Sequence, residues 1–203
     1  MKGFYFITDP THSSKGIASD AVKAVTAGVK IIQYRNKAAE TRVLYDEASH
    51  MKNMCMGSGC RLIINDRIDI ALAVDADGVH IGQEDLPYQE ARKLLGKDKI
   101  IGVTVHTIDE AVTAERIGAD YLGVSPIFAT GTKPDAGMPC GIEMLKAIRS
   151  VCRIPIAAIG GIDLTNVRQV IEAGADMVCA ISAVVAKPDV AAEIRKFQKE
   201  FSL

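Results

Sequence analysis

Short runs of apolar residues recur along the whole chain, separated by longer segments with helical spacing. The runs are rich in Ile and Val, as expected for parallel strands that are buried on both faces. Between two of them, Ala111, Val112, Ala114 and Ile117 form a stripe typical of a helix that covers a sheet. The predicted strands are Phe4–Thr8, Val29–Tyr34, Arg61–Asn65, Gly78–Ile81, Ile100–Val105, Tyr121–Val124, Ile156–Ile159 and Met177–Ile181.

Eight strand–helix units are the number that closes a (β/α)8 barrel. An open, doubly wound sheet is the alternative, but it usually has fewer strands and a Gly-rich fingerprint after the first strand. Here the first predicted strand runs into the segment Asp9-Pro10-Thr11-His12 instead. We therefore predict an α/β TIM barrel that forms a single catalytic domain over residues 1–203.

The composition restricts the partners that this chain is expected to have. The net charge is −1, which gives no reason to expect a nucleic acid or a membrane surface as a partner. The N-terminal apolar run is too short for a signal peptide, and the five cysteines include no CxxC pair. We expect a reduced, cytoplasmic protein that acts on small molecules, with monomer and homo-oligomer both left open.

Basic side chains gather at the end of the second predicted strand. Gln33, Arg35 and Lys37 alternate with their neighbours, so an extended backbone points all three the same way. Two cations and an amide at the mouth of a barrel suit a phosphate or diphosphate. A solvated basic loop is the alternative interpretation.

Carboxylates follow the next two predicted strands. Asp66 comes directly after the third strand, and Asp85 lies in the segment after the fourth. Two carboxylates at one end of a barrel can hold Mg²⁺ together with oxygens of a substrate phosphate. Helix capping is the alternative, because Asp85 precedes a Leu-Pro pair and Pro favours the first helical turn.

The remaining strand ends carry groups that bind anions. Thr104 and His106 share one face of the fifth strand; His106 is either an acid–base group or a cap for the next helix. The loop Ser125–Lys133 offers hydroxyls, a glycine and a lysine, and the segment 134–141 after it is predicted to close over substrate. Gly160-Gly161 and Ile181-Ser182 end the last two strands, where barrels of this kind bind phosphate. Two separate anion sites at one barrel end predict two phosphorylated substrates.

At this point the sequence resembles the thiamine phosphate synthase family. Its motifs follow in order along nearly the whole chain: QYRNK, LIINDRIDIALA, DGVHIGQEDLP, GVTVH, ADYLGVSPIFATGTK, IPIAAIGGI and GADMVCAISAV. Within them, the segments NDR, QEDLP and PIFATGTK are together highly specific. The resemblance implies a Mg²⁺-dependent transferase of thiamine biosynthesis. It would join a pyrimidine diphosphate to a thiazole phosphate and release pyrophosphate by a dissociative substitution.

The resemblance also implies roles for individual residues, with Mg²⁺ held by Asp66 and Asp85. The pyrimidine diphosphate would be bound by Gln33, Tyr34, Arg35, Asn36, Lys37 and Asn65. The thiazole phosphate would be bound by Thr130, Gly131, Thr132, Gly161, Ile181 and Ser182. The residues that assist departure of the pyrophosphate would be Arg35, Lys37, Thr104 and Lys133.

Two positions depart from the family pattern. Asn36 stands where the family usually has Glu, which affects how Arg35 is oriented, and Thr104 stands where it usually has Ser, which keeps the hydroxyl. The competing functions are a thiazole tautomerase of the same superfamily and a regulatory barrel without turnover. Neither needs the complete metal and diphosphate set that this chain retains.

Overall fold

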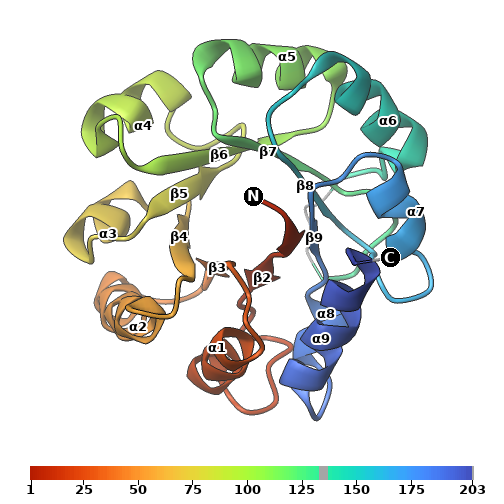
Figure 1. Cartoon of the computed structure of the whole chain (residues 1–203). Coiled ribbons are helices and arrows are strands. Elements are labelled where there is room, and N and C mark those ends of the chain that lie inside the picture. Colours follow the sequence, from red (N-terminus) through yellow and green to blue (C-terminus); the bar gives the residue numbers. More distant parts are fainter. Residues whose placement is uncertain (133–136, 203) are drawn as a thin grey trace.

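The strands form one parallel sheet that curls into a barrel (Figure 1). The computed structural model describes residues 1–132 and 137–202. Its strands are β1 (Gly3–Phe4), β2 (Phe6–Ile7), β3 (Ile31–Tyr34), β4 (Arg61–Asn65), β5 (Gly78–Ile81), β6 (Ile100–Val105), β7 (Tyr121–Val124), β8 (Ile156–Ile159) and β9 (Met177–Cys179). Each pairs in parallel with its neighbours in the order β1-β9-β8-β7-β6-β5-β4-β3-β2, so the predicted TIM barrel is confirmed.

The first predicted strand is divided into two pieces by the closure of the barrel. β1 pairs with β9, and β2, which follows after the single residue Tyr5, pairs with β3. The amide of Tyr5 donates to the carbonyl of Val178 at 2.9 Å, and the amide of Thr8 donates to the carbonyl of Gln33 at 3.0 Å. The strand thus changes partner along its length and joins the two ends of the sheet.

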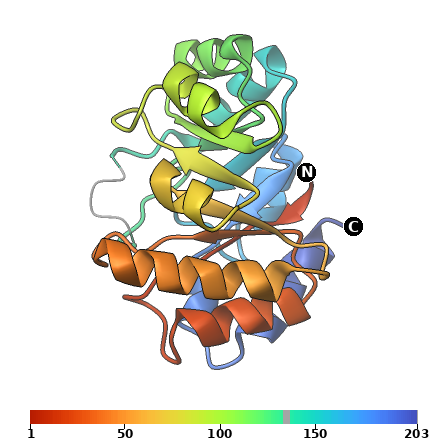
Figure 2. The ribbon, with the colours of Figure 1, turned by 90° about the vertical axis from the view of Figure 1, so that its left-hand side faces the viewer.

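The helices form a ring around the sheet (Figure 1). They are α1 (Ile17–Thr26), α2 (Thr41–Cys55), α3 (Ile68–Ala73), α4 (Tyr88–Leu95), α5 (Ile108–Ile117), α6 (Gly141–Val151), α7 (Val167–Glu172), α8 (Ser182–Val185) and α9 (Val190–Glu200). Figure 2 shows α1 and α2 side by side along one flank of the barrel. No helix in the described part of the chain is long and apolar enough to cross a membrane.

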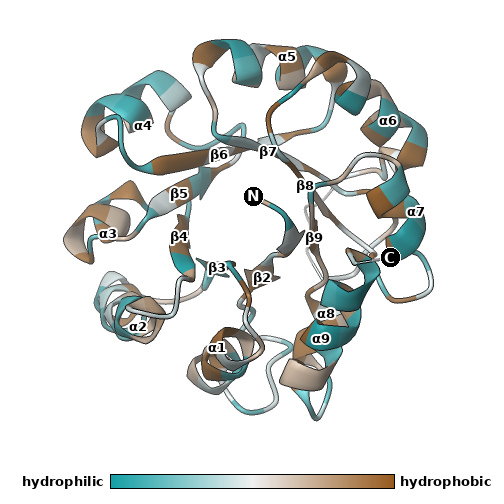
Figure 3. Cartoon of the chain, viewed as in Figure 1, coloured by the Kyte–Doolittle hydropathy of each residue, from teal (hydrophilic) through white to brown (hydrophobic). Residues whose placement is uncertain are grey.

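The alternation of strand side chains creates two hydrophobic cores. The larger lies between the sheet and the helices, where Leu62 and Ile64 are almost completely buried. Figure 3 shows the resulting mixture of apolar and polar residues along the helices. The smaller core lies inside the barrel and includes Tyr5, Ile63 and Tyr121. These inner side chains fill the interior instead of leaving a pore.

One glycine shows how tightly the interior is filled. A Cβ atom at Gly102 would lie only 2.0 Å from Cζ of Tyr121, so the ring of Tyr121 occupies the space that a side chain on β6 would need. The tyrosine forms part of a polar layer across the barrel, and the space above it stays open toward the carboxyl ends of the strands. The fold therefore provides a floor and places the strand-end residues around it.

Candidate functional site

A cavity of about 730 Å³ opens at the carboxyl ends of the strands. Its wall takes residues from every part of the barrel, including Gln33, Asp66, Thr104 and Ser182. This is the end of a TIM barrel at which active sites are found. A cavity of this volume can bury a small organic ligand with its phosphate groups.

The basic residues after β3 enter the cavity as the strand alternation predicts. Gln33, Arg35 and Lys37 all line its wall. The side chains of Tyr34 and Asn36 lie on the opposite face of the strand and turn toward α2. There the hydroxyl of Tyr34 donates to Oε2 of Glu47 at 2.5 Å, and Nδ2 of Asn36 donates to the same oxygen at 3.1 Å. The two side chains expected at the pyrimidine diphosphate thus brace the strand from outside, because neighbouring residues point to opposite faces.

Arg35 is held by residues at the end of the first strand. Its Nη1 atom donates to Oδ2 of Asp9 at 3.3 Å. Its amide donates to Oγ1 of Thr8 at 2.8 Å, and the same hydroxyl donates to its carbonyl at 3.1 Å. The sequence analysis missed Asp9, although an acidic residue at the end of the strand beside β3 was a signal that it could reach the basic cluster.

Asp66 and Asp85 meet at the edge of the cavity. Oδ2 of Asp66 lies 3.5 Å from Nζ of Lys37, and Oδ2 of Asp85 accepts the amide of Gly82 at 2.6 Å. Burial and then the nearby Asp85 carboxylate raise the pKa of Asp66 despite the lysine. Neither aspartate caps a helix, since the N-cap residues of α3 and α4 are Arg67 and Pro87.

The pair has the chemistry of a site for a hard divalent cation. Two adjacent carboxylates repel each other, and a cation between them would remove that repulsion. Among residues 1–132 and 137–202, no cluster of three or more His, Cys, Asp or Glu side chains could hold a metal by itself. A Mg²⁺ ion here would therefore take its remaining oxygens from water or from a substrate phosphate, which is how Mg²⁺ is often bound.

A chain of hydrogen bonds crosses the floor of the cavity. Nε2 of Gln33 donates to the hydroxyl of Tyr5 at 2.9 Å, and this hydroxyl lies 2.8 Å from that of Tyr121. Tyr121 contacts Nδ1 of His80 at 2.9 Å, and Nε2 of His80 lies 2.8 Å from Oγ1 of Thr104. Burial raises the pKa of both tyrosines, which keeps the phenols neutral. The floor thus presents amide, phenol, imidazole and hydroxyl groups to a ligand.

His80 is a residue that the sequence analysis overlooked. It lies in the middle of β5 and points inward, between Gly78 and Gly82. The ring needs the glycine on β7, since a Cβ atom at Gly123 would lie 2.7 Å from Cε1 of His80. A polar residue at an inward position of a buried strand was the signal that could have identified it.

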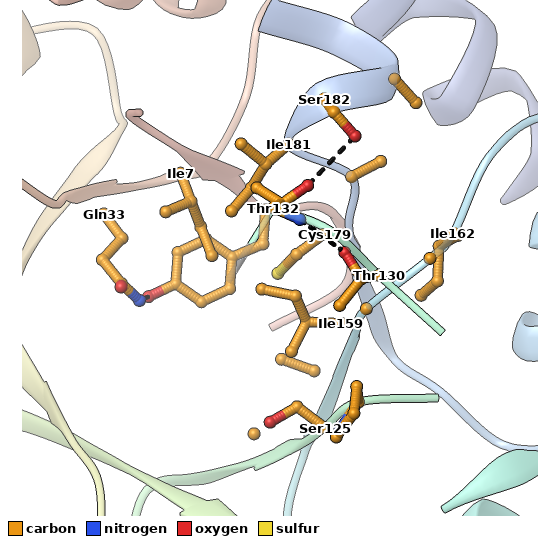
Figure 4. A pocket seen from close by; sticks show the side chains of 18 of the residues that line it. Ile7, Gln33, Ser125, Thr130, Thr132, Ile159, Ile162, Cys179, Ile181 and Ser182 are labelled. Carbon is orange, nitrogen blue, oxygen red and sulfur yellow. Dashed lines mark hydrogen bonds between the residues drawn. The ribbon is translucent and has the colours of Figure 1, made fainter. Parts of the chain in front are cut away.

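Figure 4 shows the other half of the cavity, where the hydroxyls of Thr130, Thr132 and Ser182 lie beside apolar side chains such as Ile159 and Ile181. Oγ1 of Thr132 donates to Oγ of Ser182 at 3.2 Å, and the amide of Thr132 donates to Oγ1 of Thr130 at 3.2 Å. Gly161 has a left-handed φ of 62°, and a Cβ atom there would lie 2.5 Å from the carbonyl oxygen of Ala129. The two loops therefore approach each other at backbone distance, which only glycine permits.

The other predicted residues are distributed around these two halves. Asn65 and Ile181 line the cavity, whereas Gly131 is exposed in the loop between two threonines that do. Lys133 lies outside the described residues, as does part of the segment 134–141. His106 lies away from the cavity wall, with Nδ1 2.6 Å from the carbonyl oxygen of Ser125.

The cap of α5 is Thr107, not His106. The hydroxyl of Thr107 accepts the amide of Glu110 at 3.2 Å, and the Glu110 carboxylate in turn accepts the amide of His106 at 2.6 Å. This reciprocal pattern is a capping box displaced by one residue. His106 is not among the described residues that line the cavity, which favours neither of its predicted roles.

The similarities to known proteins agree over nearly the whole chain. A family model described as thiamine monophosphate synthase matches residues 4–184. Thiamine-phosphate synthase of Methanosarcina mazei is 53% identical over 194 residues, which cover 96% of this chain and 80% of that protein. The corresponding protein of Chloroflexus aurantiacus is 50% identical over 196 residues, covering 96% and 90% of the two chains. The solved structure of thiamine phosphate pyrophosphorylase from Pyrococcus furiosus has 36% identity and a TM-score of 0.90, covering 98% of this chain and 95% of the other.

Proposed function

The chain belongs to the thiamine monophosphate synthase family, and from this premise we propose that it joins an aminopyrimidine methyl diphosphate to a phosphooxyethyl thiazole. The products are thiamine phosphate and pyrophosphate. The observation that carries the proposal is that one cavity holds a cationic half with paired carboxylates and, apart from it, a half with hydroxyls and glycines. Each half suits one of the two phosphorylated substrates.

The pyrimidine diphosphate is assigned to the cationic half. Its ring lies over the polar floor, where Gln33 offers its amide group to the ring nitrogens and the amino group, and His80 supports the floor through Tyr121 and Thr104. Its diphosphate extends toward Arg35 and Lys37, with Lys133 added from the loop after β7. Charged donors of this kind bind phosphate oxygens more strongly than neutral ones do.

The reaction proceeds by departure of pyrophosphate, followed by attack of the thiazole nitrogen on the exposed methylene carbon. The electrons of the aminopyrimidine ring stabilise the cation that remains. Negative charge accumulates on the leaving group in the transition state, so Arg35, Lys37, Lys133 and the Thr104 hydroxyl accelerate this step. The thiazole nitrogen carries no proton, so attack needs no general base.

The paired carboxylates fit the Mg²⁺ ion that the family implies. Asp66 and Asp85 would hold it, and the ion supplies neutralisation of charge on the diphosphate. The two carboxylates alone would repel that group. Lys37, whose Nζ lies 3.5 Å from Oδ2 of Asp66, is the cationic residue of this half that contacts the carboxylate pair.

The thiazole phosphate is assigned to the half with the hydroxyls and glycines. The Gly160–Gly161 backbone and the start of α8 offer amide groups, and Thr130, Thr132 and Ser182 offer hydroxyls. Holding both rings in one cavity turns the bond-forming step into a reaction between neighbours. The cytoplasmic location expected from the sequence suits a biosynthetic transferase and stays part of the proposal.

Incubation of the protein with each substrate alone and with both, in the presence of Mg²⁺, tests the proposal. Pyrophosphate and thiamine phosphate should form only when both substrates are present. A thiazole tautomerase would instead isomerise the thiazole carboxylate form without releasing pyrophosphate. A regulatory barrel would bind the ligands and leave them unchanged.

A further inference from the structure

Asp9 is a buried carboxylate that the proposed reaction does not use directly. It follows β2 at the carboxyl end of the barrel and is only 2% exposed. It is not among the described residues that form the cavity wall, but Arg35, to which it binds, is. A buried carboxylate needs partners that satisfy its charge, so its contacts indicate its purpose.

The two oxygens of Asp9 serve different parts of the structure. Oδ1 accepts the amides of Thr11 and His12, each at 3.0 Å, and lies 2.9 Å from Nδ1 of His12. Oδ2 faces Nη1 of Arg35 at 3.3 Å. The loop contacts fix the carboxylate, so it can act as a rigid support for the arginine.

The same strand end fixes the backbone of Arg35. The hydroxyl of Thr8 donates to the carbonyl of Arg35 and accepts a hydrogen bond from the amide of Arg35. One guanidinium nitrogen, Nη1, is bound to Asp9, and Arg35 also lines the cavity. An arginine has a large rotamer entropy, and an orientation fixed before substrate arrives reduces the entropy lost on binding.

We propose that Asp9 is a positioning residue that orients Arg35 toward the departing pyrophosphate. The inference rests on the proposed function, in which Arg35 binds the diphosphate. The Asp9 charge by itself would repel a diphosphate, so a purely electrostatic effect has the opposite sign. Removal of the carboxylate charge therefore distinguishes the two effects. Catalysis should slow if Asp9 positions Arg35, and should accelerate if Asp9 only repels the diphosphate.

Asp9→Asn is the test variant, and Asp20→Asn is its matched control. The amide oxygen of an asparagine can still accept the loop amides, but its NH₂ group cannot accept from Arg35. Asp20 is also 2% exposed and contacts the same loop, accepting the hydroxyl of Ser13 at 2.5 Å; its ion pair is with Lys23. We expect kcat to fall about tenfold in Asp9→Asn and to stay within about twofold in Asp20→Asn, with the KM for thiazole phosphate unchanged in both.

A double-mutant cycle with Arg35→Ala shows whether Asp9 acts through the arginine. In the Arg35→Ala protein, Asp9→Asn should cause no further loss of kcat, because the supported group is already absent. The same fold loss in both backgrounds would overturn the inference and assign Asp9 to the stability of the loop.

Calorimetry with inorganic pyrophosphate keeps the inference separate from the proposed reaction. Wild type should bind pyrophosphate more tightly than Asp9→Asn, and the difference should vanish in the Arg35→Ala background. Equal or tighter binding by Asp9→Asn, or no binding by wild type, would overturn the inference. If wild type makes no thiamine phosphate but the pyrophosphate comparison holds, the proposed function fails and the positioning of Arg35 stands.

Discussion

The close approach of two loops at Gly161 makes this position a sensitive probe of the thiazole phosphate half. Gly161→Ala adds one methyl group at a backbone φ of 62°, which costs an L-residue about 1–2 kcal/mol. The new Cβ atom would also lie 2.5 Å from the carbonyl oxygen of Ala129 and 2.8 Å from Cβ of Phe128. Such overlap costs about 1–3 kcal/mol when neighbours must shift.

The total of about 2–5 kcal/mol lies within the usual stability of a domain, so the variant should fold with a lowered free energy of unfolding. The atoms that must move precede Thr130 and Thr132 in the chain, so the shift reaches the hydroxyls of that half directly. We expect a loss of at least tenfold in thiazole phosphate affinity, or about 1.4 kcal/mol. Pyrimidine diphosphate affinity should fall much less, because of its assigned residues only Lys133 belongs to this loop and the others follow other strands.

Calorimetry with each substrate separately measures both affinities, and denaturant unfolding measures the stability. Gly28→Ala is the matched control, since Gly28 also has a left-handed φ, 81°, but a Cβ atom there would meet no atom within 4 Å. It should show the cost of strain alone, with both affinities unchanged. Equal losses of both affinities in Gly161→Ala, or retention of thiazole phosphate affinity, would refute the division of the cavity into two halves.

Four further predictions concern the charged and phenolic groups. Arg35→Ala and Lys133→Ala should each slow single-turnover product formation, which corresponds to a rise of about 2–4 kcal/mol in activation free energy, and should retain thiazole phosphate affinity. An unchanged rate in rapid-quench measurements would exclude a role in the departure of pyrophosphate. Asp66→Asn and Asp85→Asn should raise the Mg²⁺ concentration needed for half-maximal pyrophosphate release, and identical titrations would rule out the metal site. Because burial and Asp85 raise the pKa of Asp66, stability is lost as the pH rises from the ordinary pKa of the unfolded chain through the raised pKa of the folded protein. Asp66→Asn should therefore melt higher than wild type at neutral pH without metal, whereas a lower melting temperature would contradict this. Burial likewise raises the pKa of Tyr34, so the free energy of unfolding should fall above a pH of about 10, where the tyrosine ionises first in the unfolded chain. In denaturant unfolding, Tyr34→Phe should lose less of this free energy than wild type over the same pH range.

The positions of the strands could be predicted because each is a short apolar run buried on both faces. The division of the first strand into β1 and β2 could not, since it depends on which strands lie on either side after closure. The start of β3 at Ile31 instead of Val29 and the end of β9 at Cys179 instead of Ile181 have a similar origin. Pairing with neighbours, rather than local hydrophobicity, decides where a ladder begins and ends.

The basic cluster could be predicted from the alternation of Gln33, Arg35 and Lys37, and the same rule places Tyr34 and Asn36 on the other face. Their carboxylate partner, Glu47, was not visible in the sequence, because it lies on the next helix in the chain. The partners of Arg35 were also missed, because they follow the preceding strand and only the pairing of the two strands in the barrel brings them to Arg35. Spacing along one strand is local information, whereas contacts between strand ends require the fold.

The central claim is that one cavity joins the two phosphorylated substrates. A rapid-quench time course with both substrates and Mg²⁺ tests this most directly, with pyrophosphate and thiamine phosphate measured in the same samples. The account predicts that both products appear together, in equal amounts, and that neither forms when one substrate is omitted. Pyrophosphate without thiamine phosphate, or the absence of both products from the folded protein, would contradict it.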